Sequence, residues 1–171
     1  ISNITFSYNL TTIGDCAFNN TNISSVEMFD HVKSVGAGAF MDCKNLSSVR
    51  LSKALETIGA FAFGYCEKLI GIEIPKSLKK TTEAYFPSHM YDYQFGVFIG
   101  SNNLKNVTFE KGITQIANGL FSKSFGLDEI IIPDTVTSIG ANAFQYCSRL
   151  KKITLSKSLI SIGADAFTET P

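Results

Sequence analysis

The sequence has no surplus of either charge and no long apolar run. Fifteen Lys plus Arg balance fifteen Asp plus Glu, so the formal net charge is zero. This balance argues against a general phosphate-binding surface, and we expect no nucleic acid partner. Hydrophobic residues make up 44% of the chain, yet no run of them approaches the roughly 20 residues that a membrane-spanning helix needs. We therefore expect no membrane insertion within residues 1–171.

Patterns that carry catalytic chemistry are also missing. Neither His31 nor His89 has a second His, Cys or carboxylate at metal-ligand spacing. No G-x-S-x-G, H-E-x-x-H or P-loop motif occurs. We therefore predict that the protein is not an enzyme and holds no metal or other cofactor. The chain begins at Ile1 without an initiator Met or a signal-peptide pattern, which favours a segment of a longer protein.

The chain does contain a repeat. The dipeptide Ala-Phe recurs at one point of most copies, at Ala17-Phe18, Ala39-Phe40, Ala62-Phe63, Ala143-Phe144 and Ala166-Phe167. Counting in steps of 23 residues places Phe86 after Phe63 and Phe144 after Phe121, whereas Phe86 to Phe121 spans 35 residues, which is 23 plus 12. A fixed period of 20 to 30 residues is the signature of a solenoid.

We predict one domain, residues 1–171, built from seven units. These lie near 1–22, 23–45, 46–68, 69–103 with a 12-residue insertion, 104–126, 127–149 and 150–171. Their shared skeleton is L-x-x-I-x-I-P-x-x-V-x-x-I-G-x-x-A-F-x-x-C. The I-x-I alternation predicts a short strand and the following V-x-x-I a second extended stretch. A Gly corner then precedes the Ala-Phe pair, whose spacing to the Cys predicts a short helical turn. The predicted fold class is therefore α/β, a solenoid with a parallel sheet on one face.

The skeleton resembles the BspA-type (treponemal-type) leucine-rich repeat family. The stretch "IPDTVTSIGANAFQYCSRLKKITL", which contains Pro133, is similar to the family signature almost position for position, and the resemblance covers essentially the whole chain. It implies a curved, right-handed solenoid from a large surface or secreted protein. It also implies adhesion to host matrix proteins, to cells or to other microbes, and it offers no catalytic residues.

One residue of each first strand points away from the core. On this alignment these residues are Thr5, Glu27, Arg50, Glu73, Thr108, Ile131 and Thr154. They form either a solvated sheet face or a broad surface for a partner. As candidate partner-binding residues we take Arg50, Glu73 and Ile131.

The fourth unit breaks the repeat. Thr82 replaces the corner Gly, and counting puts Phe86 at the Ala-Phe position, His89 at the Cys position and the extra residues at 87–103. The extra segment is unusually aromatic for a loop. We expect residues 97–99 to cover the core, and we predict that Tyr91, Tyr93 and Phe95 either anchor a partner or only patch the core.

Three of the four cysteines share the position three residues after the repeat Phe. We expect Cys43, Cys66 and Cys147 to be buried free thiols, although adjacent units also allow a Cys43–Cys66 disulfide. Cys16 lies off this position and should be more exposed. Both terminal units lack an obvious polar cap, so we expect apolar core to be open at both ends.

Together with the resemblance, these patterns predict a non-enzymatic binding or adhesion module at the cell surface or outside the cell. The partner would be a host matrix protein, a cell-surface protein or a glycan. Two alternatives stay open: a structural spacer or stalk, and an intracellular scaffold for protein–protein interactions.

Overall fold

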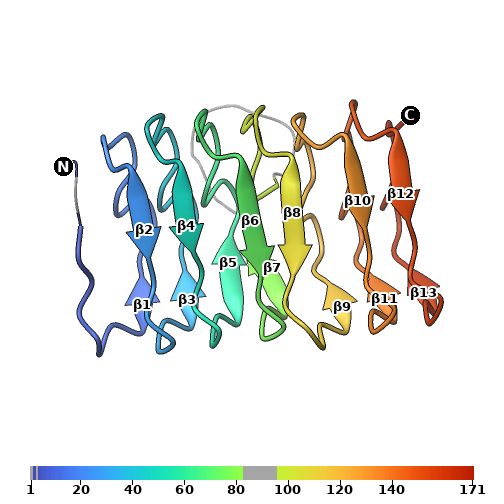
Figure 1. Ribbon diagram of the computed structural model, residues 1–171, viewed down its shortest axis with the longest axis horizontal. Coiled ribbons are helices and arrows are strands. Elements are labelled where there is room, and N and C mark those ends of the chain that lie inside the picture. The colour runs from blue at the N-terminus through green and yellow to red at the C-terminus, as the bar shows by residue number, and fades with distance from the viewer. Residues whose placement is uncertain (1, 3, 83–95) are drawn as a thin grey trace.

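In the computed structural model the chain forms a stack of units, each of which makes one turn (Figure 1). The structure describes residues 2, 4–82 and 96–171. The units lie side by side along the long axis, with the first unit at one end and the last at the other. Each described unit after the first contains two short strands, and the first unit contains one.

The first strand of a unit corresponds to the predicted I-x-I alternation. These strands are β2 (Ser25–Glu27), β4 (Ser48–Arg50), β6 (Gly71–Ile74), β8 (Asn106–Phe109), β10 (Glu129–Ile131) and β12 (Lys152–Thr154). The second strand corresponds to the predicted second extended stretch. These strands are β1 (Thr12–Ile13), β3 (Ser34–Val35), β5 (Thr57–Gly59), β7 (Lys80–Thr82), β9 (Gln115–Ile116), β11 (Ser138–Ile139) and β13 (Ser161–Ile162).

All strand pairs are parallel and join equivalent positions of neighbouring units. The second strands pair in the orders β1-β3-β5-β7 and β13-β11-β9. The first strands pair only two by two, as β2-β4, β6-β8 and β10-β12. The sequence therefore predicted both strands of the unit, but the first-strand face is three separate pairs within the described residues and not one continuous sheet.

The turn that carries the Ala-Phe pair is not helical. In unit 6 the residues two before and two after Phe144, Asn142 and Tyr146, have φ of 56° and 55°. Left-handed residues this close together cannot continue a right-handed α-helix. No helix occurs in the described residues, so the predicted helical turns and the α/β class are not found. The fold is a parallel β-solenoid of about six complete turns.

The same turn forms a third set of hydrogen bonds between units. The N–H of Phe40 donates to the Ala62 carbonyl (2.8 Å), and the N–H of Phe144 donates to the Ala166 carbonyl (2.8 Å). The left-handed residues explain this arrangement, because they turn alternate N–H groups along the stack instead of back into the same unit. Satisfying these backbone groups is what lets a bulky residue such as Tyr146 hold a strained φ.

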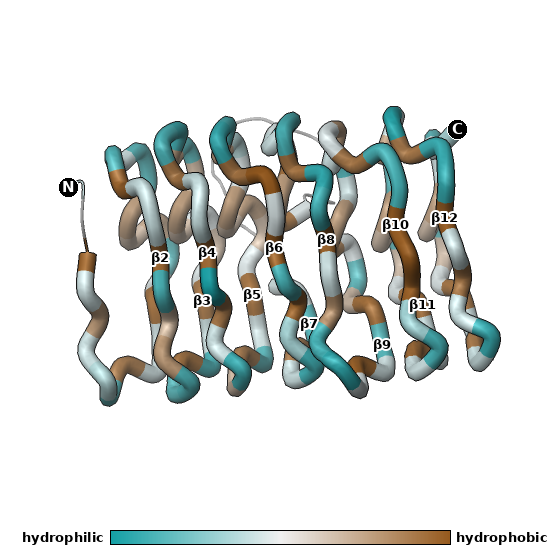
Figure 2. Tube along the Cα trace, in the orientation of Figure 1, coloured by the Kyte–Doolittle hydropathy of each residue, from teal (hydrophilic) through white to brown (hydrophobic). Residues whose placement is uncertain are grey.

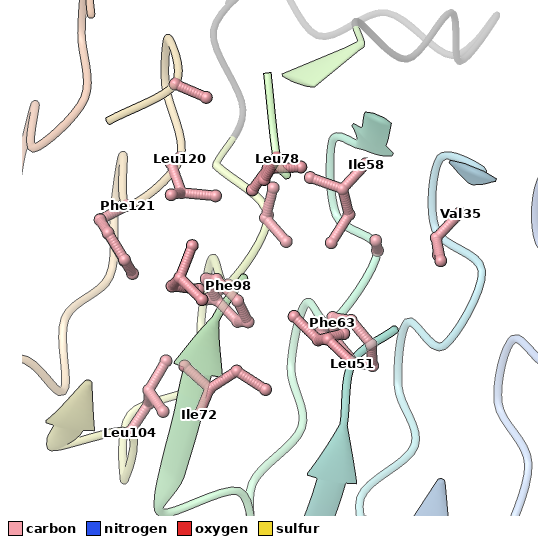
Figure 3. Close-up of a cluster of buried hydrophobic side chains, with 14 of the residues drawn as sticks. Val35, Leu51, Ile58, Phe63, Ile72, Leu78, Phe98, Leu104, Leu120 and Phe121 are labelled. Atoms are coloured by element: carbon pink, nitrogen blue, oxygen red, sulfur yellow. The ribbon is translucent and has the colours of Figure 1, made fainter. Parts of the chain in front are cut away.

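The repeat Phe rings form a nearly parallel internal stack. Adjacent ring centroids are 5.2 to 5.9 Å apart in the order Phe18, Phe40, Phe63, Phe98, Phe121, Phe144, Phe167. Both strands add aliphatic side chains to the same core, as Figure 3 shows for Ile58 and Ile72 around Phe63 and Phe98. No unit could bury its own apolar side alone, so the stack is the source of stability.

Phe98, and not Phe86, follows Phe63 in this stack. The N–H of Phe63 donates to the Val97 carbonyl (2.9 Å), the bond that Ala62 accepts from Phe40 one unit earlier. Val97 and Phe98 are therefore the Ala-Phe pair of unit 4, and both are fully buried. The 12 extra residues consequently lie between Thr82 and Gly96, which corrects the predicted position 87–103.

The corner glycines are required by the neighbouring unit. A Cβ on Gly59 would stand 2.2 Å from the Ala37 backbone nitrogen, and one on Gly163 would stand 2.3 Å from that of Ala141. Only two corners carry a side chain, Thr82 and Ala117, and they flank the insertion. The two corners without glycine therefore lie on either side of the insertion, although Thr82 still pairs with Gly59 of unit 3.

The joint between units 4 and 5 is held differently from the others. Strands β7 and β9 are not paired, and among the described residues the Ser124 hydroxyl is buried without a partner. Two side-chain bonds replace the missing ladder: the Thr81 hydroxyl donates to the Asn118 carbonyl, and the Gln115 amide donates to the Lys79 carbonyl (2.7 Å). The four-residue pairing of β6 with β8, the contact of Lys76 with Glu110 and the stacking of Phe98 on Phe121 also hold this joint.

The two ends of the stack differ. At the first unit Phe6 is buried and packs edge-on against Phe18, with ring centroids 5.7 Å apart. At the last unit Leu155 and Ile162 are 42% and 49% exposed, whereas Ile139, the equivalent of Ile162 in unit 6, is 2% exposed. The expectation of two open ends is therefore correct only for the C-terminal unit.

Candidate partner-binding surface

The first strands present the row of outward residues that the sequence predicted. Thr5, Glu27, Arg50, Glu73, Thr108, Ile131 and Thr154 are all exposed. Pairing sets the order of neighbours, because Glu27 lies opposite Arg50, Glu73 opposite Thr108, and Ile131 opposite Thr154. We call this row the outward stripe. The outward stripe is polar except for Ile131, and Figure 2 shows a hydrophobic stretch on β10.

Arg50 is held in place by its neighbours. Its guanidinium donates to the Met28 carbonyl (2.6 Å) and to both carboxylate oxygens of Asp30 (3.3 and 3.4 Å), and it lies 4.0 Å from the Glu27 carboxylate. The Asp30 carboxylate in turn accepts a bond from the backbone N–H of Lys53 (3.0 Å). A guanidinium fixed in this way loses little conformational entropy when it meets a partner.

An open hollow of about 230 Å³ lies beside Arg50 on the first-strand face. It is lined by Val49, Arg50, Leu51, Lys53, Glu73, Pro75 and Glu110. Val49, Leu51 and Pro75 supply apolar surface, and the charged side chains surround it. In the described residues the side chains of Glu73 and Lys53 have no ion-pair partner. Each can therefore accept a group of opposite charge from a bound molecule without giving up an internal contact.

The hollow coincides with an interruption of the strand ladder. Strands β4 and β6 are neighbours, yet no backbone pairing joins them within the described part of the chain. At two paired joints an aspartate of the earlier unit ties the strand ends together, because Asp30 accepts from the Lys53 backbone N–H (3.0 Å) and Asp134 accepts from the Lys157 backbone N–H (2.9 Å). Between units 3 and 4 the equivalent position in the earlier unit is Lys53, which cannot accept such a bond. Lys53 and Glu110 were not predicted from the sequence, because their role depends on this cross-unit pairing.

Ile131 stands apart from the hollow, on β10. Its side chain is 65% exposed in the middle of an otherwise polar row. Among the candidate residues, the structure brings Arg50 and Glu73 together at the hollow and places Ile131 separately, as an exposed apolar side chain on the same face. The remaining candidates, Tyr91, Tyr93 and Phe95, lie outside the described residues.

The cysteine position has a specific structural role. The thiols of Cys66 and Cys147 donate to the carbonyls of Phe40 (3.3 Å) and Phe121 (3.1 Å), each in the preceding unit. In unit 4 the Ser101 hydroxyl makes the equivalent bond to Phe63 (2.8 Å). Ser101, and not His89, therefore occupies this position, and a small buried donor is what it requires.

All four cysteines are free; Cys43, Cys66 and Cys147 are buried, and Cys16 is exposed. This confirms buried free thiols and makes the alternative Cys43–Cys66 disulfide wrong for this structure. Burial raises the pKa of the Cys66 thiol, and it raises the pKa of Cys147 from 9.0 to about 12. Because the thiolate is the reactive form, the buried thiols should be inert.

We expect a thiol-reactive chromogenic reagent at pH 8 to modify one cysteine of the native protein rapidly. That cysteine is Cys16, and the other three should react only after denaturation. Cys16→Ser is the control and should abolish the fast phase. Rapid labelling of two or more thiols in the folded protein would contradict this assignment.

Between pH 9 and 12 the unfolded thiol loses its proton while folded Cys147 keeps it, so the free energy of unfolding should fall as pH rises through that range.

Neither a metal centre nor a membrane-spanning helix is found among residues 2, 4–82 and 96–171. No group of three or more His, Cys, Asp or Glu side chains is placed to hold a metal ion there. The same ranges contain no helix that is long and apolar enough to cross a membrane.

The architecture is that of a repeat solenoid protein with an exposed strand face. A family model then matches the whole chain. The model for the BspA type leucine-rich repeat region, present in six copies, matches residues 1–90 and 79–171. The chain belongs to this family. A search of curated proteins found no significant match.

Solved structures share the fold. A leucine-rich repeat protein of T. pallidum is 22% identical with a TM-score of 0.61, and the match covers 95% of this chain and 72% of that one. A leucine-rich cell surface protein of Faecalibacterium prausnitzii is 26% identical with a TM-score of 0.62, covering 99% and 43%. The pneumococcal vaccine antigen PcpA is 24% identical with a TM-score of 0.57, covering 94% and 40%. This chain thus spans less than half of the latter two.

Proposed function

We propose that this chain is a non-enzymatic binding module of a cell-surface or secreted protein. Its partner is a host matrix or cell-surface protein, which it contacts through Arg50, Glu73 and Ile131 of the outward stripe. The aromatic insertion residues Tyr91, Tyr93 and Phe95 are proposed as a second contact region. The observation that carries the proposal is the hollow beside Arg50 and Glu73, whose mixed polar and apolar lining includes a fixed guanidinium and two unpaired charges.

Three further features support a partner at this face. An exposed Ile131 in a polar row supplies the apolar contact that interface centres use, and a fixed Arg is a residue type enriched there. Opposite charges alternate along the stripe, which favours a partner with a matching pattern and opposes others. The Faecalibacterium protein, described as a cell surface protein, supports the proposed location.

The test is saturable binding of the purified chain to a panel of extracellular-matrix proteins and to whole cells. A partner found in this way should bind the triple variant Arg50→Ala, Glu73→Ala, Ile131→Ala at least about tenfold more weakly, because central interface residues carry most of the affinity. The matched control changes three outward residues of the second strands, Thr12, Ser138 and Ser161, to Ala and should bind like the unmodified chain.

A second variant, Tyr91→Ala, Tyr93→Ala, Phe95→Ala, tests the insertion separately. Loss of binding in this variant alone would move the site from the outward stripe to the insertion. If neither variant loses binding, the proposed surface is wrong. If the unmodified chain binds nothing on the panel, the spacer or stalk interpretation is favoured. Partners found only among intracellular proteins would favour the scaffold.

A further inference from the structure

One edge of the solenoid carries a local surplus of positive charge although the whole chain is neutral. This edge is the turn between the first and second strand of each unit, the lower edge in Figure 2. In units 3, 4 and 5 this turn together with the first residue of the second strand comprises residues 52–57, 75–80 and 110–115. They contain five lysines and two glutamates, a surplus of three positive charges. We call Lys53, Lys76, Lys79, Lys80 and Lys111 the lysine edge.

The stacking brings these side chains into register. Strand β6 pairs with β8 so that Ile74 lies opposite Phe109, which places Lys76 next to Lys111. The Lys76 stem reaches the turn of unit 5, where its Cδ lies 3.9 Å from the position that a Cβ on Gly112 would take. Lys53 holds the same position in unit 3. The backbones of Lys76 and Lys111 therefore follow one another at the spacing of parallel strands, roughly 4.8 Å, and Lys53 precedes them one unit earlier.

The two glutamates neutralise only part of this charge. Lys76 pairs with Glu110 (3.6 Å) and Lys79 pairs with Glu56 (3.4 Å). Lys53, Lys80 and Lys111 are exposed, and no ion pair holds them in the described residues. Like charges at strand spacing repel one another, so an anion that bridges them removes a cost as well as adding an attraction.

The flanking units limit the length of the site. At the position of Lys53, Lys76 and Lys111, unit 2 has Asp30 and unit 6 has Asp134. The Asp30 carboxylate binds Arg50 of the neighbouring unit, and the Asp134 carboxylate lies 3.9 Å from the Lys157 ammonium. A bound anion should therefore span three units and stop at an acidic residue on either side.

The residue types between the lysines indicate which anion fits. The three turns contain no aromatic residue, so they offer no platform on which nucleic acid bases could stack. They also lack an exposed apolar anchor for a peptide. They do carry an exposed hydroxyl group at Thr114, which can hydrogen-bond to a sugar hydroxyl, whereas the Thr57 and Ser77 hydroxyls already donate to Ser34 and to the Leu55 carbonyl.

We infer that the lysine edge is a binding site for a linear sulfated saccharide, with successive sulfate groups meeting Lys53, Lys80 and Lys111 across units 3 to 5. The site lies beside the first-strand face and shares Lys53 with the hollow there, whereas Lys80 and Lys111 do not line that hollow. It does not depend on that proposal.

The probe is a fully sulfated heparin hexasaccharide, titrated into the protein by calorimetry at low salt, about 50 mM NaCl. We expect saturable binding at one site, with affinity that falls steadily as salt is raised because counterions are released from the saccharide. The triple variant Lys53→Gln, Lys80→Gln, Lys111→Gln should bind about tenfold more weakly, since it loses three exposed ionic contacts and no internal ion pair.

A charge-matched triple provides the control. Lys44→Gln, Lys105→Gln, Lys151→Gln removes the same charge from the other edge and should change the affinity less than about twofold. Arg50→Ala, Glu73→Ala, Ile131→Ala should also retain hexasaccharide binding, which separates this site from the outward stripe. The inference is overturned if both triple lysine variants lose affinity for the hexasaccharide to the same extent. It is also overturned if the Arg50→Ala, Glu73→Ala, Ile131→Ala variant loses this affinity, or if a desulfated hexasaccharide binds as tightly as the sulfated one. Tighter binding of single-stranded DNA than of the hexasaccharide would assign the edge to nucleic acid instead.

Discussion

Gly59→Ala should destabilise the protein by about 3 kcal/mol or more, near the upper end of what an added methyl group costs in a packed interior. The added Cβ would stand 2.2 Å from the backbone nitrogen and 2.5 Å from the Cα of Ala37. Backbone atoms cannot rotate away as a side chain can, so units 2 and 3 would have to separate. That separation disturbs the β3–β5 pairing, the turn hydrogen bonds and the Phe stack together. Urea unfolding followed by circular dichroism measures the change.

Two other glycines test whether contact with the neighbouring unit causes the destabilisation expected for Gly59→Ala. Gly14 holds the same repeat position in unit 1, at the end of the stack, and no atom lies within 4 Å of the position that a Cβ would take there. Gly14→Ala should therefore change the free energy of unfolding by less than about 0.5 kcal/mol. Gly119 has open space but a φ of 59°, so Gly119→Ala should cost about 1 kcal/mol from backbone strain alone. Similar losses in the Gly14 and Gly59 variants would show that contact between units is not the reason for the glycine corners of this chain.

Phe98→Ala should cost about 3 to 5 kcal/mol, the range for removing a fully buried aromatic ring. Phe98 is 0% exposed and stacks between Phe63 and Phe121, with centroids 5.9 and 5.8 Å away. It belongs to the joint between units 4 and 5, where the second-strand ladder is missing, so few other contacts can compensate. Thermal unfolding of the variant should show a correspondingly lower midpoint.

The control for Phe98 is Phe125→Ala. Phe125 lies in the next unit and is 36% exposed, so its loss should cost about 1 kcal/mol or less. Phe98→Leu keeps most of the apolar volume and should fall between the two variants. A cost for Phe98→Ala no larger than that for Phe125→Ala would mean that Phe98 is not the ring that continues the stack.

The sequence allowed the strands to be predicted because their residues repeat in period and in type. Alternating apolar residues such as Ile130 and Ile132 are 3% and 2% exposed, while Ile131 between them is 65% exposed. Alternation of this kind depends only on the two-residue period of a strand. The outward positions of Arg50, Glu73 and Ile131 followed from the same rule, whereas their binding of a partner stays a proposal.

The position of the insertion was predicted wrongly because counting forward from Phe63 gave a false match at Phe86. Counting backward from Phe121 leads to Phe98, 23 residues earlier, followed three residues later by Ser101 at the donor position. The two corners without glycine, Thr82 and Ala117, were a second signal. Both signals locate the insertion only when it is known that the corner residue of each unit packs on the unit before it.

The helical turn was predicted wrongly for a different reason. Spacing of apolar residues cannot reveal the sign of φ when Lys123, Tyr146 or Glu169 adopts the left-handed conformation. In the earlier units this conformation accompanies hydrogen bonds to the next unit, such as that from the Tyr146 N–H to the Thr168 carbonyl (2.9 Å), which the spacing of residues within one unit does not reveal. The hollow was also beyond sequence reasoning, because it forms where the β4–β6 ladder is interrupted.

The joint between units 4 and 5 has a mechanical consequence. The first and last units stand at opposite ends of the stack, so tension applied to them loads the joints one after another. At most joints the turn and second-strand bonds would resist together. Between units 4 and 5 the load falls mainly on the β6–β8 pair and two side-chain bonds. Under force this joint would open first and divide the molecule into two shorter stacks.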